Sequence, residues 1–150
     1  MKGAPKPDVI VMAEDDADDR LLTRDALAEC QWKAELHFVE NGEELLDYLL
    51  RRGKYDQAAS SPRPGLILLD LNMPRRDGRE VLSEIKANPD LRCIPVVVLT
   101  TSRADTDIEA IYQLGANSFI SKPVRFKGLV QVMGLLCQYW FKTVELPAPK

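Results

Sequence analysis

The sequence predicts an open, doubly wound α/β fold, in which a five-stranded parallel sheet is covered by five helices. Short aliphatic runs rich in β-branched residues alternate with longer stretches of helical periodicity, which is the pattern of repeated strand–helix units around a parallel sheet. The chain has 150 residues, and 45% of them are hydrophobic. This length and composition suit one domain with a buried core.

Five runs are predicted as strands. They are DVIVMA (8–13), ELHFV (35–39), LILLD (66–70), PVVVLT (95–100) and SFIS (118–121). The third and fourth are almost unbroken in their apolar character, as expected for central strands covered on both faces. The second and fifth are shorter or more mixed, so we expect them at the edges of the sheet.

Five helices are predicted between and after these strands. Their expected ranges are 18–30, 42–51, 79–88, 105–114 and 126–141. Asn41 precedes the second helix, Pro89 follows the third and Gly115 follows the fourth, which are typical end signals. Residues 52–65 exceed the ~2–6 residues usual for a helix-to-strand connection. We interpret them as an exposed loop at the amino-terminal end of the strands, either a tolerated insertion or a partner contact.

Composition excludes several functions. The net charge is −3 and Lys and Arg are scattered, so we expect no direct nucleic-acid partner. No apolar run approaches the ~18 residues that span a bilayer, and no signal peptide is recognised at the start of the chain, which predicts a cytoplasmic protein without a membrane segment.

The three cysteines, Cys30, Cys93 and Cys137, are far apart in the sequence, and His37 is the only histidine. We expect free thiols in or near the core, and neither a disulfide nor zinc.

Acidic residues follow two of the predicted strands. Glu14 and Asp15 come directly after the first strand, and Asp70 ends the third. The carboxyl ends of parallel strands open on one edge of the sheet, where ligands bind in such folds. Crowded carboxylates repel one another unless a cation neutralises them, and oxygen ligands alone favour Mg²⁺. The sequence therefore predicts a magnesium site at this edge.

The other acids nearby have a simpler interpretation. Asp16, Asp18 and Asp19 fit the negatively charged start of a helix, which the helix dipole favours. Asp77 precedes the third helix and is expected to cap it.

Four motifs in a fixed order resemble those of a known family. They are the Glu14-Asp15 pair, DLNMPRRDG from Asp70 to Gly78, LTTS with Thr100, and FISKP with Lys122 and Pro123. Together they resemble the receiver domain of two-component response regulators, the CheY-like fold. The resemblance implies a flavodoxin-like sheet with strand order 2-1-3-4-5. It covers residues 8–141 and leaves tails at 1–7 and 142–150.

The resemblance implies a phosphoacceptor with a metal beside it. Asp70 would take a phosphoryl group from a phosphohistidine on a sensor histidine kinase. Mg²⁺ would be held by Asp15, by Glu14 through water, by Asp70 and by the backbone carbonyl of Asn72. Asn72 and Ser102 would tune the attack of water on the acyl phosphate.

It also implies a switch. Lys122 would contact the phosphoryl oxygens, aimed by a cis peptide bond before Pro123. Thr100 would donate its hydroxyl to the phosphoryl group, and Phe119 would turn inward when Thr100 moves. A plain core aromatic is the alternative for Phe119. The chain would then be no enzyme in its own right, but a phosphoacceptor that assists its own phosphorylation and dephosphorylation.

The end of the chain suggests how the switch is used. Only nine residues, KTVELPAPK, follow residue 141, so we expect a stand-alone receiver whose output is a protein contact. The last helix carries a second apolar stripe of Val132, Leu135 and Tyr139, which predicts a homodimer. The alternative is that the tail, with Val144 and Leu146, folds back over the stripe. The ending QYWFKTVELP and the long 52–65 loop resemble regulators paired with phytochrome kinases, which are often dimeric.

Two other functions use some of the same residues. A phosphatase of the haloacid dehalogenase type needs a second acid two residues after the nucleophile, where this chain has Asn72. The second is a phosphorylation-independent adaptor. It would not need the residues of a phosphorylation site, yet all are present: Glu14, Asp15, Asp70, Thr100 and Lys122.

Overall fold

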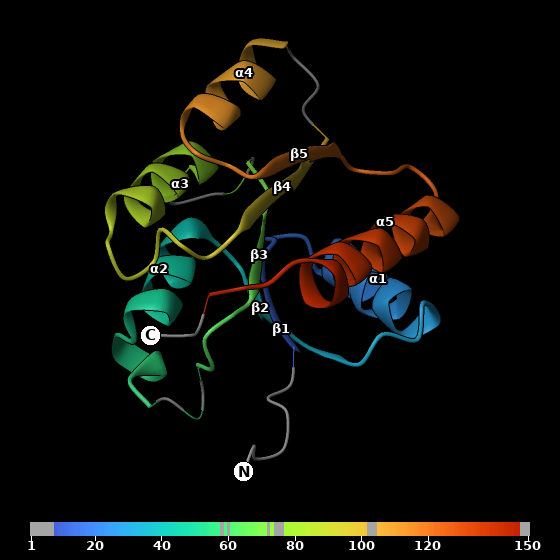
Figure 1. The fold of residues 1–150 in the computed structure, drawn as a ribbon, viewed down its shortest axis with the longest axis horizontal. Coiled ribbons are helices and arrows are strands. Elements are labelled where there is room, and N and C mark those ends of the chain that lie inside the picture. Colours follow the sequence, from blue (N-terminus) through green and yellow to red (C-terminus); the bar gives the residue numbers. More distant parts are fainter. Residues whose placement is uncertain are drawn as a thin grey trace.

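Five parallel strands form one sheet in the order β2-β1-β3-β4-β5 (Figure 1). The structure is a computed structural model that describes residues 8–57, 59, 61–71, 73, 77–101 and 105–147. The strands are β1 (Asp8–Ala13), β2 (Ala34–Val39), β3 (Leu66–Leu69), β4 (Val96–Thr100) and β5 (Ser118–Ser121). Both the predicted fold class and the strand order are confirmed.

Burial along the strands follows their place in the sheet. Every residue of β3 and β4 is buried, whereas β2 and β5, the two edge strands, are mostly half-buried. The register pairs Ala13 with Val39 and with Leu69, and Leu69 with Val98. The carboxyl ends of these strands therefore lie at one edge, as the parallel arrangement requires.

The helices form a layer on each face of the sheet. Figure 1 shows α1 (Ala17–Glu29) and α5 (Phe126–Gln138) on one side, and α2 (Gly42–Leu50), α3 (Gly78–Ala87) and α4 (Asp105–Gln113) on the other. Two separate hydrophobic clusters result: one beneath α2, α3 and α4, the other beneath α1 and α5. This is the doubly wound arrangement.

Side-chain caps begin three of the helices. Asp16 accepts from the backbone N–H of Asp18 at the start of α1, and Asn41 accepts from Glu44 N at the start of α2. Asp77 accepts from Arg79 N at 2.7 Å and caps α3, as predicted. Each cap satisfies an N–H that has no partner within its helix.

The C-terminal segment differs from its prediction. The α-helix α5 ends at Gln138 and widens into a π-turn, η3 (Tyr139–Thr143), instead of running on to residue 141. Beyond this turn the chain crosses the start of β3. A Cβ at Gly65 would lie 2.8 Å from the ring of Phe141 and 3.2 Å from Leu146. The described part of the tail thus packs at the amino-terminal edge of the sheet.

The long segment before β3 is anchored at several points. It contains a short 3₁₀ turn, η1 (Gly53–Tyr55). Buried Ser61 donates to Tyr55 O and Gln57 O, and Tyr48 OH donates to Pro62 O at 2.6 Å. The segment is therefore exposed at residues 52–54, 56, 57 and 59 but fastened to α2 near its end, at Pro62.

The cysteines are free, as predicted, but they do not share one environment. Cys137 is buried and Cys30 is half-buried, whereas Cys93 is exposed in the turn before β4. Among the described residues, no helix combines the length and the apolar character that a bilayer crossing requires.

Candidate functional site

Three carboxylates meet at the carboxyl ends of β1 and β3. Asp70 N donates to Ala13 O and Glu14 N donates to Val39 O, so both acids are fixed just beyond the sheet. Glu14 and Asp70 are buried and Asp15 is exposed. One oxygen of each lies within 4.8 Å of the others. The cluster predicted from the strand ends is therefore present.

Burial makes the negative charge of this cluster costly. Burial raises the pKa of Glu14 to about 7, although the hydrogen bond and the charge of Lys122 act in the opposite direction. The nearby charge of Asp70 raises it further. A bound cation would offset the repulsion between these carboxylates and favour their ionised forms.

Lys122 follows the edge strand β5 and supplies a positive charge at the same edge of the sheet. Its backbone N–H donates to Thr100 O at 2.8 Å, which fixes the residue after β5. Its Nζ donates to Glu14 Oε1, to Asp19 Oδ2 at 3.0 Å and to Asp70 Oδ2 at 3.2 Å. Burial alone would lower the pKa of Lys122, but these carboxylates raise it above its usual value.

Thr100 and Phe119 occupy neighbouring strands. Thr100 is fully buried, and its Oγ1 donates to Asp70 Oδ1 at 3.0 Å. Val98 pairs with Phe119, and side chains two residues apart on a strand share a face, so Thr100 and Phe119 lie on the same face of the sheet. Phe119 is half-buried against the cluster beneath α4. Its backbone N–H donates to Tyr112 OH of α4 at 3.1 Å.

One prediction about the site is wrong. Within the described residues no peptide bond is cis, so the bond between Lys122 and Pro123 is trans. The trans form is favoured before proline by about 0.5–1 kcal/mol. Lys122 reaches all three carboxylates from the trans form, so nothing in this arrangement requires the cis form. Asn72 and Ser102 lie outside the described residues.

Asp19 belongs to the site although its sequence pattern was interpreted as a helix start. It lies one helical turn before Thr23, which is buried in α1, and its backbone carbonyl accepts from the Thr23 hydroxyl. The same face continues through Ala26 and Leu27, both buried. An acid on the buried face of a helix was the signal that could have indicated a partner.

The donor set fits a divalent cation. Three carboxylates offer hard oxygen ligands and no soft ligand accompanies them, which suits Mg²⁺ or Mn²⁺. Lys122 contacts two of these acids, Glu14 and Asp70, so the cation and the ammonium compete for the same oxygens. An acid held between a metal site, an ammonium and a hydroxyl is equipped to receive a phosphoryl group.

A family model decides the relationship. The model, described as the response regulator receiver domain, matches residues 10–133. The chain belongs to this family. As a receiver domain, it carries the acidic pair, Asp70, Thr100 and Lys122 at the edge where the acidic cluster fits the divalent-metal site of receivers.

Relatives and solved structures cover almost the whole receiver domain. Response regulator Rcp1 from Synechocystis sp. is 44% identical over 142 residues, which are 95% of this chain and 95% of Rcp1. The Mn²⁺-bound structure of Rcp1 matches with a TM-score of 0.85 over 95% of this chain and 100% of that one. The phosphorylated cyanobacterial phytochrome response regulator RcpA matches with 41% identity and a TM-score of 0.87, over the same shares.

A third structure extends this similarity beyond cyanobacteria. The response regulator RPA3017, in red light signaling of R. palustris, is 33% identical, with a TM-score of 0.90 over 94% of this chain and 99% of that one. These identities place the chain among response regulators and away from haloacid dehalogenase phosphatases. The receiver domain is thus a signalling module and not an enzyme of the usual kind.

Proposed function

We propose that this response regulator accepts a phosphoryl group on Asp70 from a sensor histidine kinase of the phytochrome type. The observation that supports the proposal is the convergence on Asp70 of Thr100 on one oxygen and Lys122 on the other. Its similarity to RcpA and Rcp1 supports a phytochrome-type kinase. A kinase of this class would place the regulator in the cytoplasm.

The transfer is a displacement at phosphorus. An Asp70 oxygen forms the new P–O bond while the P–N bond to the kinase imidazole breaks, and the imidazole nitrogen takes the electron pair. Mg²⁺ held by Glu14, Asp15, Asp70 and the Asn72 carbonyl would neutralise charge on the transferring oxygens. Lys122 supplies a second positive charge, and Thr100 can pass its hydroxyl bond from Asp70 to the phosphoryl group.

The proposed conformational switch starts when the Thr100 hydroxyl changes its hydrogen-bond partner from Asp70 to the phosphoryl group. When Thr100 turns toward the phosphoryl group, space opens on the face of the sheet that it shares with Phe119. We assign Phe119 the inward movement that fills this space, which alters the surface of β5 and α4. Asn72 and Ser102 are assigned the tuning of acyl-phosphate hydrolysis.

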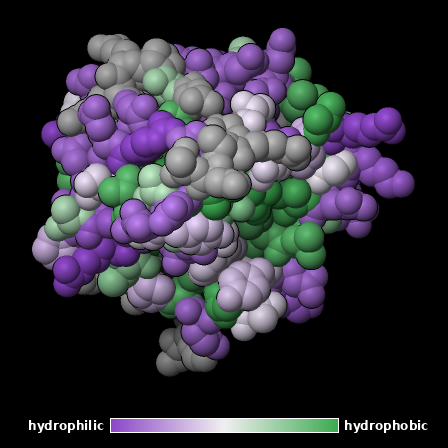
Figure 2. Space-filling model, turned by 90° about the horizontal axis from the view of Figure 1, so that it is seen from above, coloured by the Kyte–Doolittle hydropathy of each residue, from purple (hydrophilic) through white to green (hydrophobic). Residues whose placement is uncertain are grey.

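The kinase is proposed to dock over the groove beside Lys122. The groove has a volume of about 100 Å³, and its walls include Leu22 of α1, Val124 of the β5–α5 connection and Phe126, the first residue of α5. All three apolar side chains are exposed. Figure 2, which looks onto the molecule from above, shows hydrophobic side chains gathered on the side where Figure 1 places α5. Lys122 lines this groove and donates to Asp70, so a partner that covers the exposed apolar patch would lie beside the proposed phosphoacceptor.

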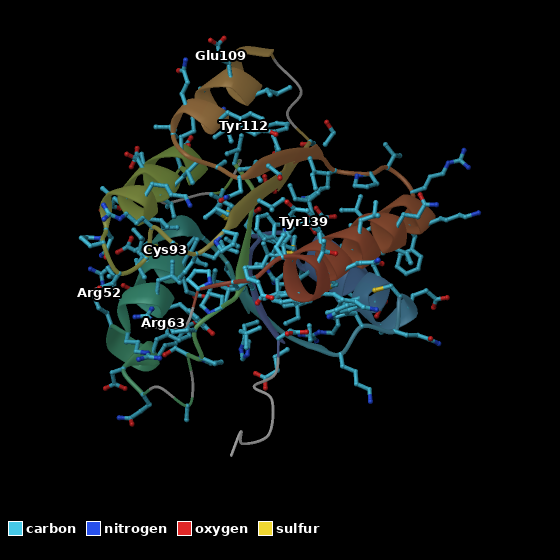
Figure 3. The ribbon with its side chains drawn as sticks, viewed as in Figure 1. Arg52, Arg63, Cys93, Glu109, Tyr112 and Tyr139 are labelled. Atoms are coloured by element: carbon cyan, nitrogen blue, oxygen red, sulfur yellow. The ribbon has the colours of Figure 1, made fainter. Side chains whose placement is uncertain are left out.

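The homodimer is proposed to form through α5. Leu135 and Tyr139 are 71% and 51% exposed, and Val132 is half-buried beside them. Figure 3 shows Tyr139 at the carboxyl end of α5. The alternative, in which the tail covers this stripe, loses support because Phe141 and Leu146 contact Gly65 instead.

Phosphorylation by a small donor tests the central proposal. The protein is incubated with acetyl phosphate and Mg²⁺ and its intact mass is measured. We expect a labile phosphoryl adduct that requires Mg²⁺, is prevented by EDTA and is lost in Asp70→Asn. Asp77→Asn is the matched control, because asparagine still caps α3 and the adduct should persist.

Two outcomes would contradict the proposal. No adduct with any donor, including phosphorylated histidine kinases, would favour a phosphorylation-independent adaptor. Turnover of varied phosphomonoesters would favour a phosphatase. Phosphotransfer from a phytochrome-type kinase, compared with unrelated histidine kinases at equal concentration, then tests the proposed partner. Equal transfer from all of them would remove the phytochrome assignment.

A further inference from the structure

Lys122 is held by one carboxylate that the metal site does not use. Its Nζ donates to Glu14, Asp19 and Asp70, which occupies all three hydrogens of the ammonium. Glu14 and Asp70 are also members of the metal-binding cluster, whereas Asp19 is not. Asp19 is therefore the partner that Lys122 can keep when a divalent cation binds.

We infer that Asp19 is a positioning residue for phosphoryl transfer, because it anchors the Lys122 ammonium beside Asp70 once the cation has taken Glu14. This inference rests on the proposed function. A cation at the cluster attracts the oxygens that now bind Lys122 and repels the ammonium. Without a second anchor, a flexible lysine side chain would leave the site when the cation enters.

The backbone of Asp19 is well fixed for this task. The Asp16 side chain accepts from Asp19 N at 3.2 Å, and Asp19 O accepts from the Thr23 hydroxyl at 2.8 Å. The carboxylate therefore projects from the rigid first turn of α1. It also forms part of the wall of the groove that Lys122 and Val124 border. Lys122 held there lies between the groove and Asp70.

Asp18 provides a matched control. It is the neighbouring acid in the same helical turn, it carries the same charge and it is exposed. Asp18→Asn and Asp19→Asn thus change the net charge equally. Any difference between them reports the specific contact with Lys122 and not the general field of α1.

Phosphorylation kinetics form the first arm of the test. At saturating Mg²⁺ and acetyl phosphate, Asp19→Asn should lower the maximum rate by about three- to tenfold, the range for a charged hydrogen bond that is partly exposed. Asp18→Asn should leave it within about twofold of wild type. Asp19→Glu keeps the charge and should restore part of the rate. In a Lys122→Ala background, Asp19→Asn should have no further effect.

Metal affinity forms the second arm and needs no phosphorylation. Mn²⁺ binding is measured from the free-ion signal in electron paramagnetic resonance. Asp19→Asn should weaken Mn²⁺ binding more than Asp18→Asn does, because Lys122 loses its remaining anchor when the ion displaces it. The difference should disappear in the Lys122→Ala background.

The two arms separate the possible failures. Equal rates and equal Mn²⁺ affinities for Asp18→Asn and Asp19→Asn would overturn the role of Asp19, as would an effect that persists without Lys122. If the wild-type protein accepts no phosphoryl group, the proposed function fails, while the Mn²⁺ arm still decides whether Asp19 anchors Lys122.

Discussion

Asp70 has a different partner on each of its carboxylate oxygens. Thr100 Oγ1 donates to Oδ1 at 3.0 Å and Lys122 Nζ donates to Oδ2 at 3.2 Å. Both Asp70 and Thr100 are buried, so their hydrogen bond is shielded from water. A buried acceptor that loses such a donor keeps its desolvation cost without the bond that offset it.

Replacement of Thr100 by valine tests this contact through stability. Valine has nearly the same shape but no hydroxyl, so Thr100→Val should lower the free energy of unfolding by about 1–2 kcal/mol. Thr100→Ser keeps the hydroxyl and should retain the hydrogen bond, although it loses a buried methyl group. Urea denaturation followed by circular dichroism measures both. A Thr100→Val protein as stable as wild type would show that this hydrogen bond contributes nothing net.

The site residues that could be predicted from the sequence are those that lie at the ends of strands. Glu14, Asp15, Asp70 and Thr100 follow or end apolar strands, so the parallel sheet alone brings them to one edge. Asp19 was missed because its part in the site depends on which face of α1 turns inward, and tertiary packing decides that. The peptide bond between Lys122 and Pro123 is trans and not cis as predicted. The isomer of a bond before proline depends on its structural surroundings and not on sequence alone.

At the scale of elements, the close packing of the start of α3 against the end of β3 depends on Gly78. An added Cβ at Gly78 would lie 2.8 Å from Asp70 O and 2.9 Å from Leu71 Cα. Both are backbone atoms that cannot move without displacing Asp70. The first residue of α3 is thus packed directly against Asp70 and Leu71, which follow the end of β3.

Two glycine-to-alanine variants separate this packing from helix propensity. Gly78→Ala should destabilise the protein by about 1–3 kcal/mol, because the methyl group overlaps the backbone. Gly134→Ala in the middle of α5 should be neutral or stabilise by up to about 1 kcal/mol. There the nearest atom to an added Cβ is Cys30 Cβ at 3.7 Å, an ordinary contact. Thermal denaturation measures both, and equal shifts of one sign would contradict the steric explanation.

Strands were more predictable than the ends of helices. β1, β3 and β4 are covered on both faces, so each is a nearly continuous aliphatic run. These runs alone predict the strand ends to within a residue or two. The end of α5 was placed too late, because Tyr139 and Trp140 continue the apolar pattern while the backbone widens into η3. Their rings pack edge to face at 5.0 Å, a contact that periodicity does not reveal.

Across the whole molecule, the reactive edge and the α5 stripe are separate surfaces. Asp70 lies at the carboxyl ends of the strands, while the tail packs against Gly65 at their amino-terminal ends. Phe141 and Leu146 are therefore engaged at Gly65. Because the stripe is on the outside of α5, a second copy can cover it without blocking Asp70.

A charge placed in the stripe tests the dimer. Leu135→Glu should shift the protein from dimer to monomer, since burying an unpaired carboxylate in an apolar contact is costly. Gln113→Glu introduces the same charge on the exposed surface of α4, a different helix, and should leave the dimer intact. Analytical ultracentrifugation over a range of concentrations measures the dissociation constant, with acetyl phosphate labelling as a check that each variant still folds. A monomeric wild type, or equal dissociation constants for both variants and wild type, would place the self-association surface elsewhere or remove it.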